Sequence, residues 1–365
     1  MSESTQQTLV CDPESADACL FCPNQGDLTD EHVFPAALGG EDVVPGATCS
    51  DCNGGFSKDF EASFNNDLEH LRYLLRIGNR EGEVPSIKAT TTIDGVELTV
   101  FLRPDGTFEL QDKKYQHTLE SGKKEWRYWL FSKEKAARLK KRAAIRGDRI
   151  EPMLGNAPMV FQPASSMPLD FIASQEALRT ATKVALMALA YRLGISFVRS
   201  DAFDRAKEFA RTGKGGRTRL FHNPNFAAAH HIGAHQHSVH VHCNAKDHTV
   251  FAIVAFLGGL TYLVQLSDNY QGLEYGFVYA YDARERAETR FMILVSGGNP
   301  KVSPADAYEH ERVAIEEVRS DRTQFDDVPA VAEQWATIFR PAAKGLADDA
   351  SDVVHRRVIS PSTKS

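Results

Sequence analysis

Apolar residues recur every three or four positions after Asp51, which is the period of a helix with one buried face. The residues on this face are Phe56, Phe60, Phe64, Leu68, Leu71 and Leu75. They predict one long helix that ends near Gly78. A second helix is predicted from a Ser174 N-cap to Gly194. Its shared face consists of Leu178, Ala181, Ala185, Ala188 and Leu189.

Alternating apolar and polar residues predict strands in two regions. Residues 85–112 contain two alternating runs with Asp-Gly turns at 94–95 and 105–106. Residues 238–297 are rich in β-branched and aromatic residues and predict three or four strands. Between these regions, residues 123–146 predict a basic helix, or a strand followed by a helix. The predicted fold class is therefore α+β, with an antiparallel sheet in its larger part.

The chain has 365 residues, enough for two or three domains. We expect a flexible N-terminus at 1–17 and a compact unit at 18–80. A larger α+β region follows at 81–340, in which residues 303–340 mix helix with acidic loop. The small, polar and charged residues of 341–365 predict a disordered tail.

Composition narrows the class of protein. Hydrophobic residues make up 42% of the chain and charged residues 25%, as in an ordinary globular protein. No apolar run reaches the roughly 18 residues of a membrane span, so we expect no membrane segment. The first residues contain neither a basic stretch nor an apolar one, so we predict no signal peptide and a cytoplasmic location.

Charge is distributed unevenly along the chain. The net charge is −7, yet Lys113–Arg149, here called the basic segment, holds 13 basic residues against 4 acidic ones. Its net charge of +9 leaves −16 for the rest of the chain. The sequence leaves two interpretations open, a surface that binds a polyanion such as nucleic acid and an ordinary solvated face.

Four of the six cysteines form two pairs, Cys19 with Cys22 and Cys49 with Cys52. Each pair has two residues between its cysteines, a spacing typical of a tetrahedral zinc site with four thiolate ligands. Four thiolates leave no open coordination position, so we expect a structural Zn²⁺. The alternatives are unliganded cysteines or a redox pair.

Glu31 and His32 lie between the two pairs, followed by Pro35 and by Gly39-Gly40, and Asn53 directly follows the last cysteine. This layout resembles the HNH endonucleases, also called His-Me or ββα-metal fingers, over Cys19 to about Glu61. The resemblance implies a zinc-stabilised, treble-clef-like ββα-metal finger. It also implies that 18–80 is an HNH nuclease domain and that 81–340 is an accessory or regulatory region.

By the same resemblance, His32 is the general base and Glu31 is a ligand of a catalytic Mg²⁺ or Mn²⁺. Asn53 is either a second ligand or the residue that fixes the histidine loop. A histidine with an ordinary pKa of about 6.5 suits proton abstraction from water, and carboxylate and amide oxygens suit these ions. Neighbours on a regular strand point to opposite faces, so Glu31 and His32 share a site only where the strand is distorted or ends.

The last ligand of the family, often a histidine on the helix, has no match in this chain. Helical spacing instead places Asn53, Ser57 and Glu61 on one face, so Glu61 is a candidate to complete the metal shell. The alternative for Glu61 is an ordinary solvated charge. Asp59 is the rival carboxylate, but it faces elsewhere on the helix.

Together these observations predict a metal-dependent endonuclease that hydrolyses phosphodiester bonds in nucleic acid. We expect double-stranded DNA as its partner, no membrane, and a role in defence against foreign DNA. The alternative is a non-catalytic zinc module that binds nucleic acid or protein. The sequence leaves the oligomeric state open, a homodimer included.

Overall fold

The computed structural model describes a set of ranges that covers most of the chain between its two ends. They are 18–93, 96–105, 107–111, 113–118, 120–122, 124–129, 133–146, 160–162, 170–221 and 233–294. The predictions for 1–17, 303–340 and 341–365 lie outside the described residues. Among the described helices, none has both the length and the apolar character needed to cross a membrane.

The chain divides into two compact units, each described here by itself. The first comprises the described parts of Met1–Val84 and Pro168–Leu346, and the second those of Pro85–Met167 and Ala347–Ser365. Both contain helices and antiparallel sheets, so the α+β class is confirmed at this level. The division into independent domains at 18–80 and 81–340 stays a prediction.

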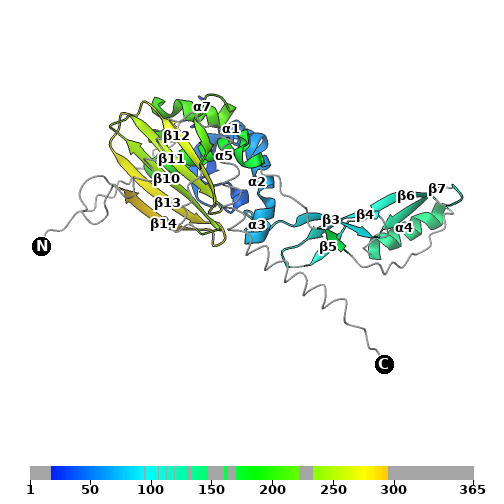
Figure 1. Cartoon of the computed structure of the whole chain (residues 1–365). Coiled ribbons are helices and arrows are strands. Elements are labelled where there is room, and N and C mark those ends of the chain that lie inside the picture. Colours follow the sequence, from blue (N-terminus) through cyan, green and yellow to red (C-terminus); the bar gives the residue numbers. More distant parts are fainter. Residues whose placement is uncertain are drawn as a thin grey trace. The chain divides into compact units, whose positions relative to one another are not determined.

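A six-stranded antiparallel sheet forms the core of the first unit, in the order β14-β13-β10-β11-β12-β9 (Figure 1). The strands are β9 (Thr218–Leu220), β10 (Gln236–Asn244), β11 (Thr249–Phe256), β12 (Leu260–Ser267), β13 (Tyr275–Asp282) and β14 (Ala287–Leu294). The region 238–297 thus holds five strands, and the prediction of three or four is wrong. The turns before β11 and β14 place His248 and Arg286 at positive φ, a conformation that glycine or asparagine adopts more readily.

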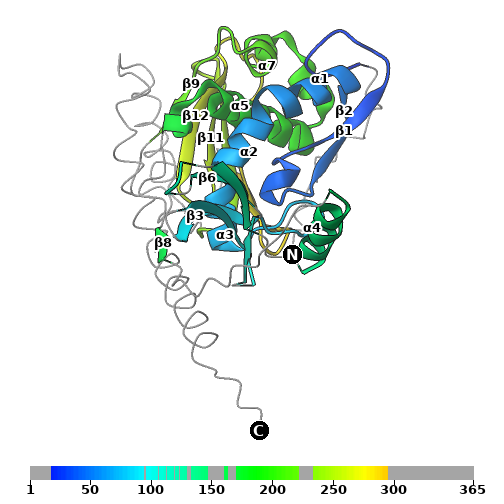
Figure 2. The same ribbon diagram turned by 90° about the vertical axis from the view of Figure 1, so that its right-hand side faces the viewer.

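Helix α5 (Gln175–Leu193) lies against one face of this sheet (Figure 2). Its boundaries are as predicted: the Ser174 hydroxyl accepts a hydrogen bond from Ala177 N at 3.2 Å, and Gly194 ends the helix. Residues 177–190, except the partly exposed Arg179, are buried because the sheet covers one side of the helix and the N-terminal segment the other. Two shorter helices follow, α6 (Ile195–Arg199) and α7 (Asp204–Thr212).

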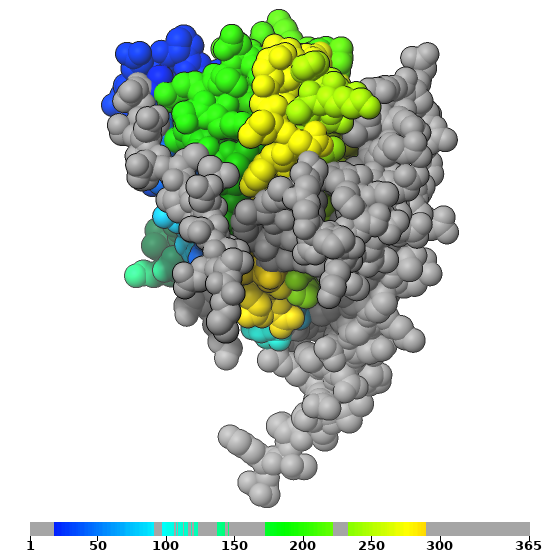
Figure 3. All heavy atoms as spheres, turned by 90° about the vertical axis from the view of Figure 1, so that its left-hand side faces the viewer, coloured from blue at the N-terminus to red at the C-terminus, as the bar shows by residue number. Residues whose placement is uncertain are grey.

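The first turn of α7 is joined to the connection between β12 and β13. Arg205 Nη1 lies 2.9 Å from Asp268 Oδ2. On the face drawn in Figure 3, green atoms from the middle of the chain lie beside yellow atoms of the later strands.

The N-terminal segment begins with two antiparallel strands, followed by a series of short helices. The elements are β1 (Leu28–His32), η1 (Ala36–Leu38), β2 (Val43–Cys49), α1 (Ser50–Phe56), η2 (Ser57–Glu61, a π-helix), α2 (Ala62–Asp67) and α3 (Glu69–Leu75). The predicted single helix is therefore interrupted, because Leu68 leaves the helical conformation with ψ near 1°. All the predicted core residues on it are buried except Leu75, which is half-buried.

The sheet holds the loop after β1 in place. Phe34 stacks on Tyr279 with ring centroids 5.8 Å apart, and the Tyr281 hydroxyl donates to Gly39 O at 3.0 Å. Gly39 has φ +87°, and a Cβ on it would lie 2.5 Å from Ala283 O. A Cβ on Gly40 would lie 2.2 Å from Phe34 O. Two glycines are thus required where the loop meets the sheet.

His237 of β10 joins the same loop to the sheet and is fully buried. Its Nε2 lies 3.0 Å from Leu38 O, and its Nδ1 accepts a hydrogen bond from Leu257 N at 3.3 Å. Burial lowers the pKa of His237 to about 4. The imidazole is therefore neutral, which is the form these two contacts require.

Among its described residues, the second unit has a four-stranded antiparallel sheet in the order β5-β4-β3-β8, a separate hairpin and the helix α4. The elements are β3 (Ile87–Ile93), β4 (Val96–Leu102), β5 (Phe108–Leu110), β8 (Val160–Gln162), the β6 (Lys113–Thr118) and β7 (Lys124–Trp129) hairpin, and α4 (Lys133–Arg146). Ile93 pairs with Val96, and the turn predicted at 94–95 lies outside the described residues. The region 123–146 is a strand followed by a helix, the second of the two predicted forms.

Candidate active site

The four predicted cysteines come together where the loop before β1 meets the start of α1. Their Sγ atoms all lie within 4.8 Å of one another, and Cys22 Sγ is 3.6 Å from Cys49 Sγ. A tetrahedral zinc with bonds of about 2.3 Å requires sulfur–sulfur distances of about 3.8 Å, so the cluster fits this ion. Within the described ranges, no other group of three or more His, Cys, Asp or Glu residues is arranged in this way.

The four other predicted site residues, Glu31, His32, Asn53 and Glu61, line one pocket of about 410 Å³. Nine further residues complete its lining: Pro35, Ala36, Ala37, Ser57, Ala62, Asn65, Asn66, Arg72 and Lys183. Asp59 is exposed and does not line the pocket, as its predicted position on the helix requires.

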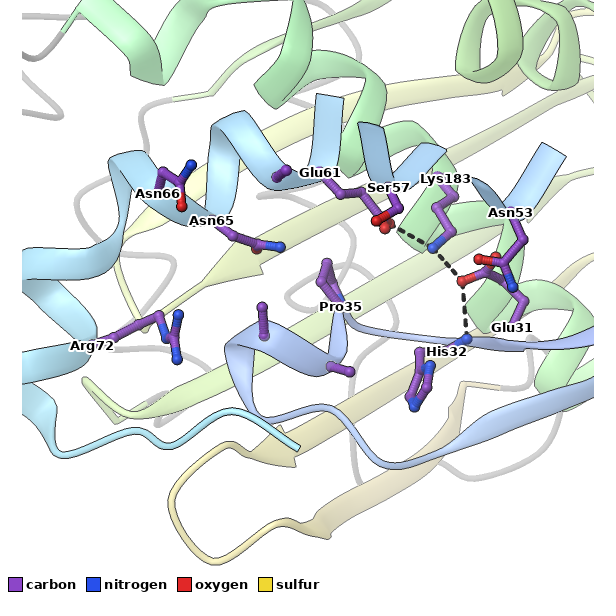
Figure 4. Close-up of a pocket in the computed structure, with 13 residues that line it drawn as sticks. Glu31, His32, Pro35, Asn53, Ser57, Glu61, Asn65, Asn66, Arg72 and Lys183 are labelled. Carbon is purple, nitrogen blue, oxygen red and sulfur yellow. Dashed lines mark hydrogen bonds and ion pairs between the residues drawn. The ribbon is translucent and has the colours of Figure 1, made fainter. Parts of the chain in front are cut away.

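The end of β1 brings Glu31 and His32 to the same pocket. The pairing of β1 with β2 shifts register between Thr29 and Glu31, and the strand ends at His32. Glu31 and His32 themselves stay in regular register, paired with Val44 and Val43, so they reach the pocket where the strand ends and not through a distortion between them. Figure 4 shows their side chains leaving the strand on opposite sides, with Glu31 turned toward Lys183. Glu31 is 4% exposed, and His32 is half-buried.

Asn53 connects α1 to β1 beside the Glu31–His32 pair. Its Nδ2 donates to Thr29 Oγ1 at 3.0 Å and to Asp30 O at 3.4 Å. These bonds hold the strand that carries His32, which is the contact expected of a loop-fixing residue. Its role as a metal ligand stays a prediction.

The π-helix η2 explains how one helical face reaches so far along the pocket. A regular α-helix rotates by about 40° between residues four apart, whereas a π turn holds more residues and reduces this drift. Asn53, Ser57 and Glu61 accordingly all line the pocket.

Lys183 of α5 binds both acidic side chains of the pocket. Its Nζ lies 2.5 Å from Glu31 Oε1 and 2.5 Å from Glu61 Oε1. Burial acts to lower the pKa of Lys183, but the charges of the two carboxylates outweigh this effect and raise it above the usual value. The ammonium is therefore charged and bridges the two acids.

The sequence analysis did not single out Lys183. In the sequence, Lys183 is marked only as a charged residue within the otherwise uncharged helical run 180–191. Lys183 is fully buried in the structure, where a lysine requires a charged partner.

The surroundings of His32 favour its neutral form. Burial is the main cause that lowers its pKa, and the positive charges of Lys183 and Arg80 add to it. The charges of Glu61 and Asp30 oppose the shift without cancelling it. A neutral imidazole can accept a proton, as a general base must.

Arg72 of α3 also lines the pocket and was not singled out from the sequence. It is 8% exposed, and its Nε has no hydrogen-bond partner. Burial lowers its pKa, and Glu69 partly offsets the effect.

Residues 19–69 match the HNH endonuclease family. The match, here called the HNH segment, spans the four cysteines and every predicted site residue. It indicates nuclease activity at the level of the family, whereas Arg72 and Lys183 lie outside it. No curated protein and no solved structure matches the chain.

The pocket residues of the HNH segment suit a hard divalent cation by their chemistry. Glu31 and Glu61 offer carboxylate oxygens and Asn53 an amide oxygen, the donors that Mg²⁺ and Mn²⁺ prefer. Both carboxylates also bind the Lys183 ammonium. A divalent ion that used these two oxygens would have to replace the ammonium there.

Proposed function

We propose that this chain is a metal-dependent HNH endonuclease that hydrolyses phosphodiester bonds in DNA. The observation that carries the proposal is the convergence of His32, Asn53 and Glu61 with Glu31 on one pocket within the HNH segment. In this proposal β1, β2 and α1 form the ββα-metal finger, and the cysteine cluster holds a structural Zn²⁺.

His32 has the role of general base, since its neutral imidazole can take a proton from the attacking water. Glu31, Asn53 and Glu61 are the residues that would hold Mg²⁺ or Mn²⁺. When bound, such an ion stabilises the charge that develops on the phosphate and on the leaving oxygen. The zinc cluster supports this arrangement because Asn53 directly follows Cys52 in α1.

Double-stranded DNA is the proposed substrate. The basic segment supplies positive charge, and the side chains of Arg138, Lys140, Lys141 and Arg142 on α4 are exposed. Exposed arginines and lysines bind the phosphate backbone without reading its sequence. We place the enzyme in the cytoplasm and assign it a role against foreign DNA, by its resemblance to standalone HNH proteins with a large accessory region.

A second candidate function is a non-catalytic zinc module that binds nucleic acid or protein. The ion bridge of Lys183 to Glu31 and Glu61 favours it, because buried acids in a structural role would be neutralised in this way. On this interpretation, the HNH segment retains the fold of the finger but does not catalyse phosphodiester hydrolysis.

Incubation with nucleic acid separates the two candidates. Supercoiled plasmid, linear duplex, single-stranded DNA and RNA are each incubated with protein that retains its zinc, with Mg²⁺, with Mn²⁺ and without added metal. The proposal expects metal-dependent cleavage of duplex DNA. Preferred cleavage of RNA would reassign the substrate, and binding without cleavage under every condition would favour the non-catalytic module.

A further inference from the structure

We propose that Arg72 is a phosphate-binding residue of the pocket and holds a backbone phosphate of the nucleic acid next to the one that is cut. The inference rests on the proposed function and adds a residue outside the HNH segment to the substrate site. It starts from a buried positive charge that forms no ion pair within the described ranges, although the charge of Glu69 acts on it.

The guanidinium of Arg72 lies in a buried environment. Arg72 is more than nine-tenths buried, its Nε has no hydrogen-bond partner, and none of the ion pairs among the described residues includes it. Burying a charge is costly unless it is paired and hydrogen-bonded. Arg179, a partly buried arginine of the same unit, meets this requirement by donating to Ala210 O and Arg211 O.

Figure 4 shows the Arg72 guanidinium pointing into the pocket at the end opposite Asn53, on the same side as Asn65 and Asn66. Asn65 Oδ1 is likewise buried without a hydrogen-bond partner. Unsatisfied polar groups therefore gather at this end, which is the pattern of a site completed by a ligand.

A guanidinium presents a planar fork of donors that matches a phosphate with two parallel hydrogen bonds. Since Glu31 and Asn53 lie at the other end of the pocket, the phosphate held by Arg72 is a neighbour of the reacting one. Loss of Arg72 should then weaken substrate binding and leave the chemical step largely unchanged.

A ligand-binding arginine and a structural one differ in their effect on stability. Without nucleic acid, Arg72 is a buried charge with no ion pair to any residue that the structure describes, so Arg72→Met should raise the melting temperature. An arginine that stabilised the fold through its contacts would have the opposite effect. Arg179→Met is the matched control, because it removes bonds to Ala210 O and Arg211 O and should lower the melting temperature while binding is unchanged.

The binding test uses the full chain with His32→Ala, so that a labelled DNA duplex is bound without being cut. Adding Arg72→Met should weaken the affinity by about ten- to a hundredfold, as expected for a hydrogen bond to a charged group. The slope of log affinity against log salt should flatten by about 0.9, the value of one phosphate contact on duplex DNA. In the cleaving enzyme, Arg72→Met should raise KM while kcat is retained.

Three results would contradict the assignment of Arg72 as a residue that binds nucleic-acid phosphate. If Arg72→Met binds duplex with unchanged affinity and salt slope, or melts at a lower temperature, Arg72 is structural and the inference fails while the nuclease proposal stands. If the His32→Ala parent does not bind duplex at all, both fail. If inorganic phosphate binds at Arg72 as tightly as the duplex does, the site takes free phosphate, and the assignment to nucleic acid is wrong.

Discussion

Lys183 Nζ lies 2.5 Å from Glu31 Oε1, which joins a buried helix to a strand 152 residues earlier in the chain. Glu31 belongs to the HNH segment, whereas Lys183 belongs to α5, between that segment and the sheet. The charge of Glu31 is therefore balanced by a residue outside the family match. The candidate site is a property of the whole first unit and not of the HNH segment alone.

Lys183→Met should destabilise the protein strongly. It leaves the Glu31 and Glu61 carboxylates facing each other without a cation, a change that costs about 3–5 kcal/mol at a buried pair. Addition of Mg²⁺ or Mn²⁺ should then restore part of the melting temperature, because the freed carboxylates can bind the ion. Thermal unfolding with and without each ion measures both effects.

Lys207→Met is the control for this variant. Lys207 is also buried, and its Nζ contacts Arg199 O, Ser200 O and Asp204 Oδ1. Its loss should lower stability with no recovery in divalent ions. Equal recovery of both variants, or of neither, would contradict competition between Lys183 and a metal for the two carboxylates.

Cys52→Ser should release the metal of the cysteine cluster. Zinc carries much of the folding energy of small modules, so the HNH segment should unfold with its loss. Elemental analysis should find about one zinc per chain in the wild type and much less in the variant. Cys243→Ser, a buried cysteine outside the cluster, should keep the zinc. Zinc-free wild-type protein, purified without chelator, would refute the assignment.

His237 should make the folded state sensitive to acid. Its pKa is about 4 when folded and about 6.5 when unfolded, so below pH 6.5 the unfolded chain binds a proton that the folded chain does not. The contribution of neutral, buried His237 to the free energy of unfolding is complete above pH 6.5. It is lost as the pH falls toward 4, by about 1.4 kcal/mol per pH unit.

Denaturant unfolding at several pH values between 4 and 7 tests this prediction, with His237→Gln as the comparison because glutamine does not titrate. The free energy of unfolding of the variant should depend less steeply on pH, by an amount that totals about 3 kcal/mol across the range. Parallel curves for the two proteins would show that His237 is not the group responsible.

Neutralising Lys140, Lys141 and Arg142 together should weaken DNA binding if the basic segment guides the substrate. Each lost phosphate contact should reduce the salt slope by about 0.9 on duplex DNA, or about 0.7 on single strands. Cleavage at saturating substrate should be largely retained. Binding titrations over a salt series measure the effect, with the exposed Arg211, Lys214 and Lys246 neutralised together as the control. An unchanged slope would exclude the segment from the binding path.

The parts of the structure that follow from local signals were predictable from the sequence. The spacing of the cysteines predicted the cluster, and the Ser174 cap and Gly194 predicted the limits of α5. Helical spacing brought Glu61 to the pocket beside Asn53. Each of these predictions depends on residues close together in the chain.

The parts that depend on distant contacts were not predictable. Lys183 meets Glu31 across 152 residues, and nothing near either residue indicates the pairing. Arg72 stands out because it is buried and forms no ion pair with a described residue, which a sequence pattern does not reveal. The number of strands was underestimated because turn residues such as His248 and Arg286 adopt a positive φ that their side chains do not favour.

The most direct test of the account compares cleavage of supercoiled plasmid by the wild type, His32→Ala and His70→Ala, in Mg²⁺ and at equal zinc content. His70 is a partly buried histidine of α3 that does not line the pocket. The account predicts that His32→Ala lowers the rate by about 10²- to 10⁴-fold, while its melting temperature and zinc content stay unchanged and His70→Ala cuts at the wild-type rate. Cleavage by His32→Ala at the wild-type rate would contradict the assignment of His32 as the general base.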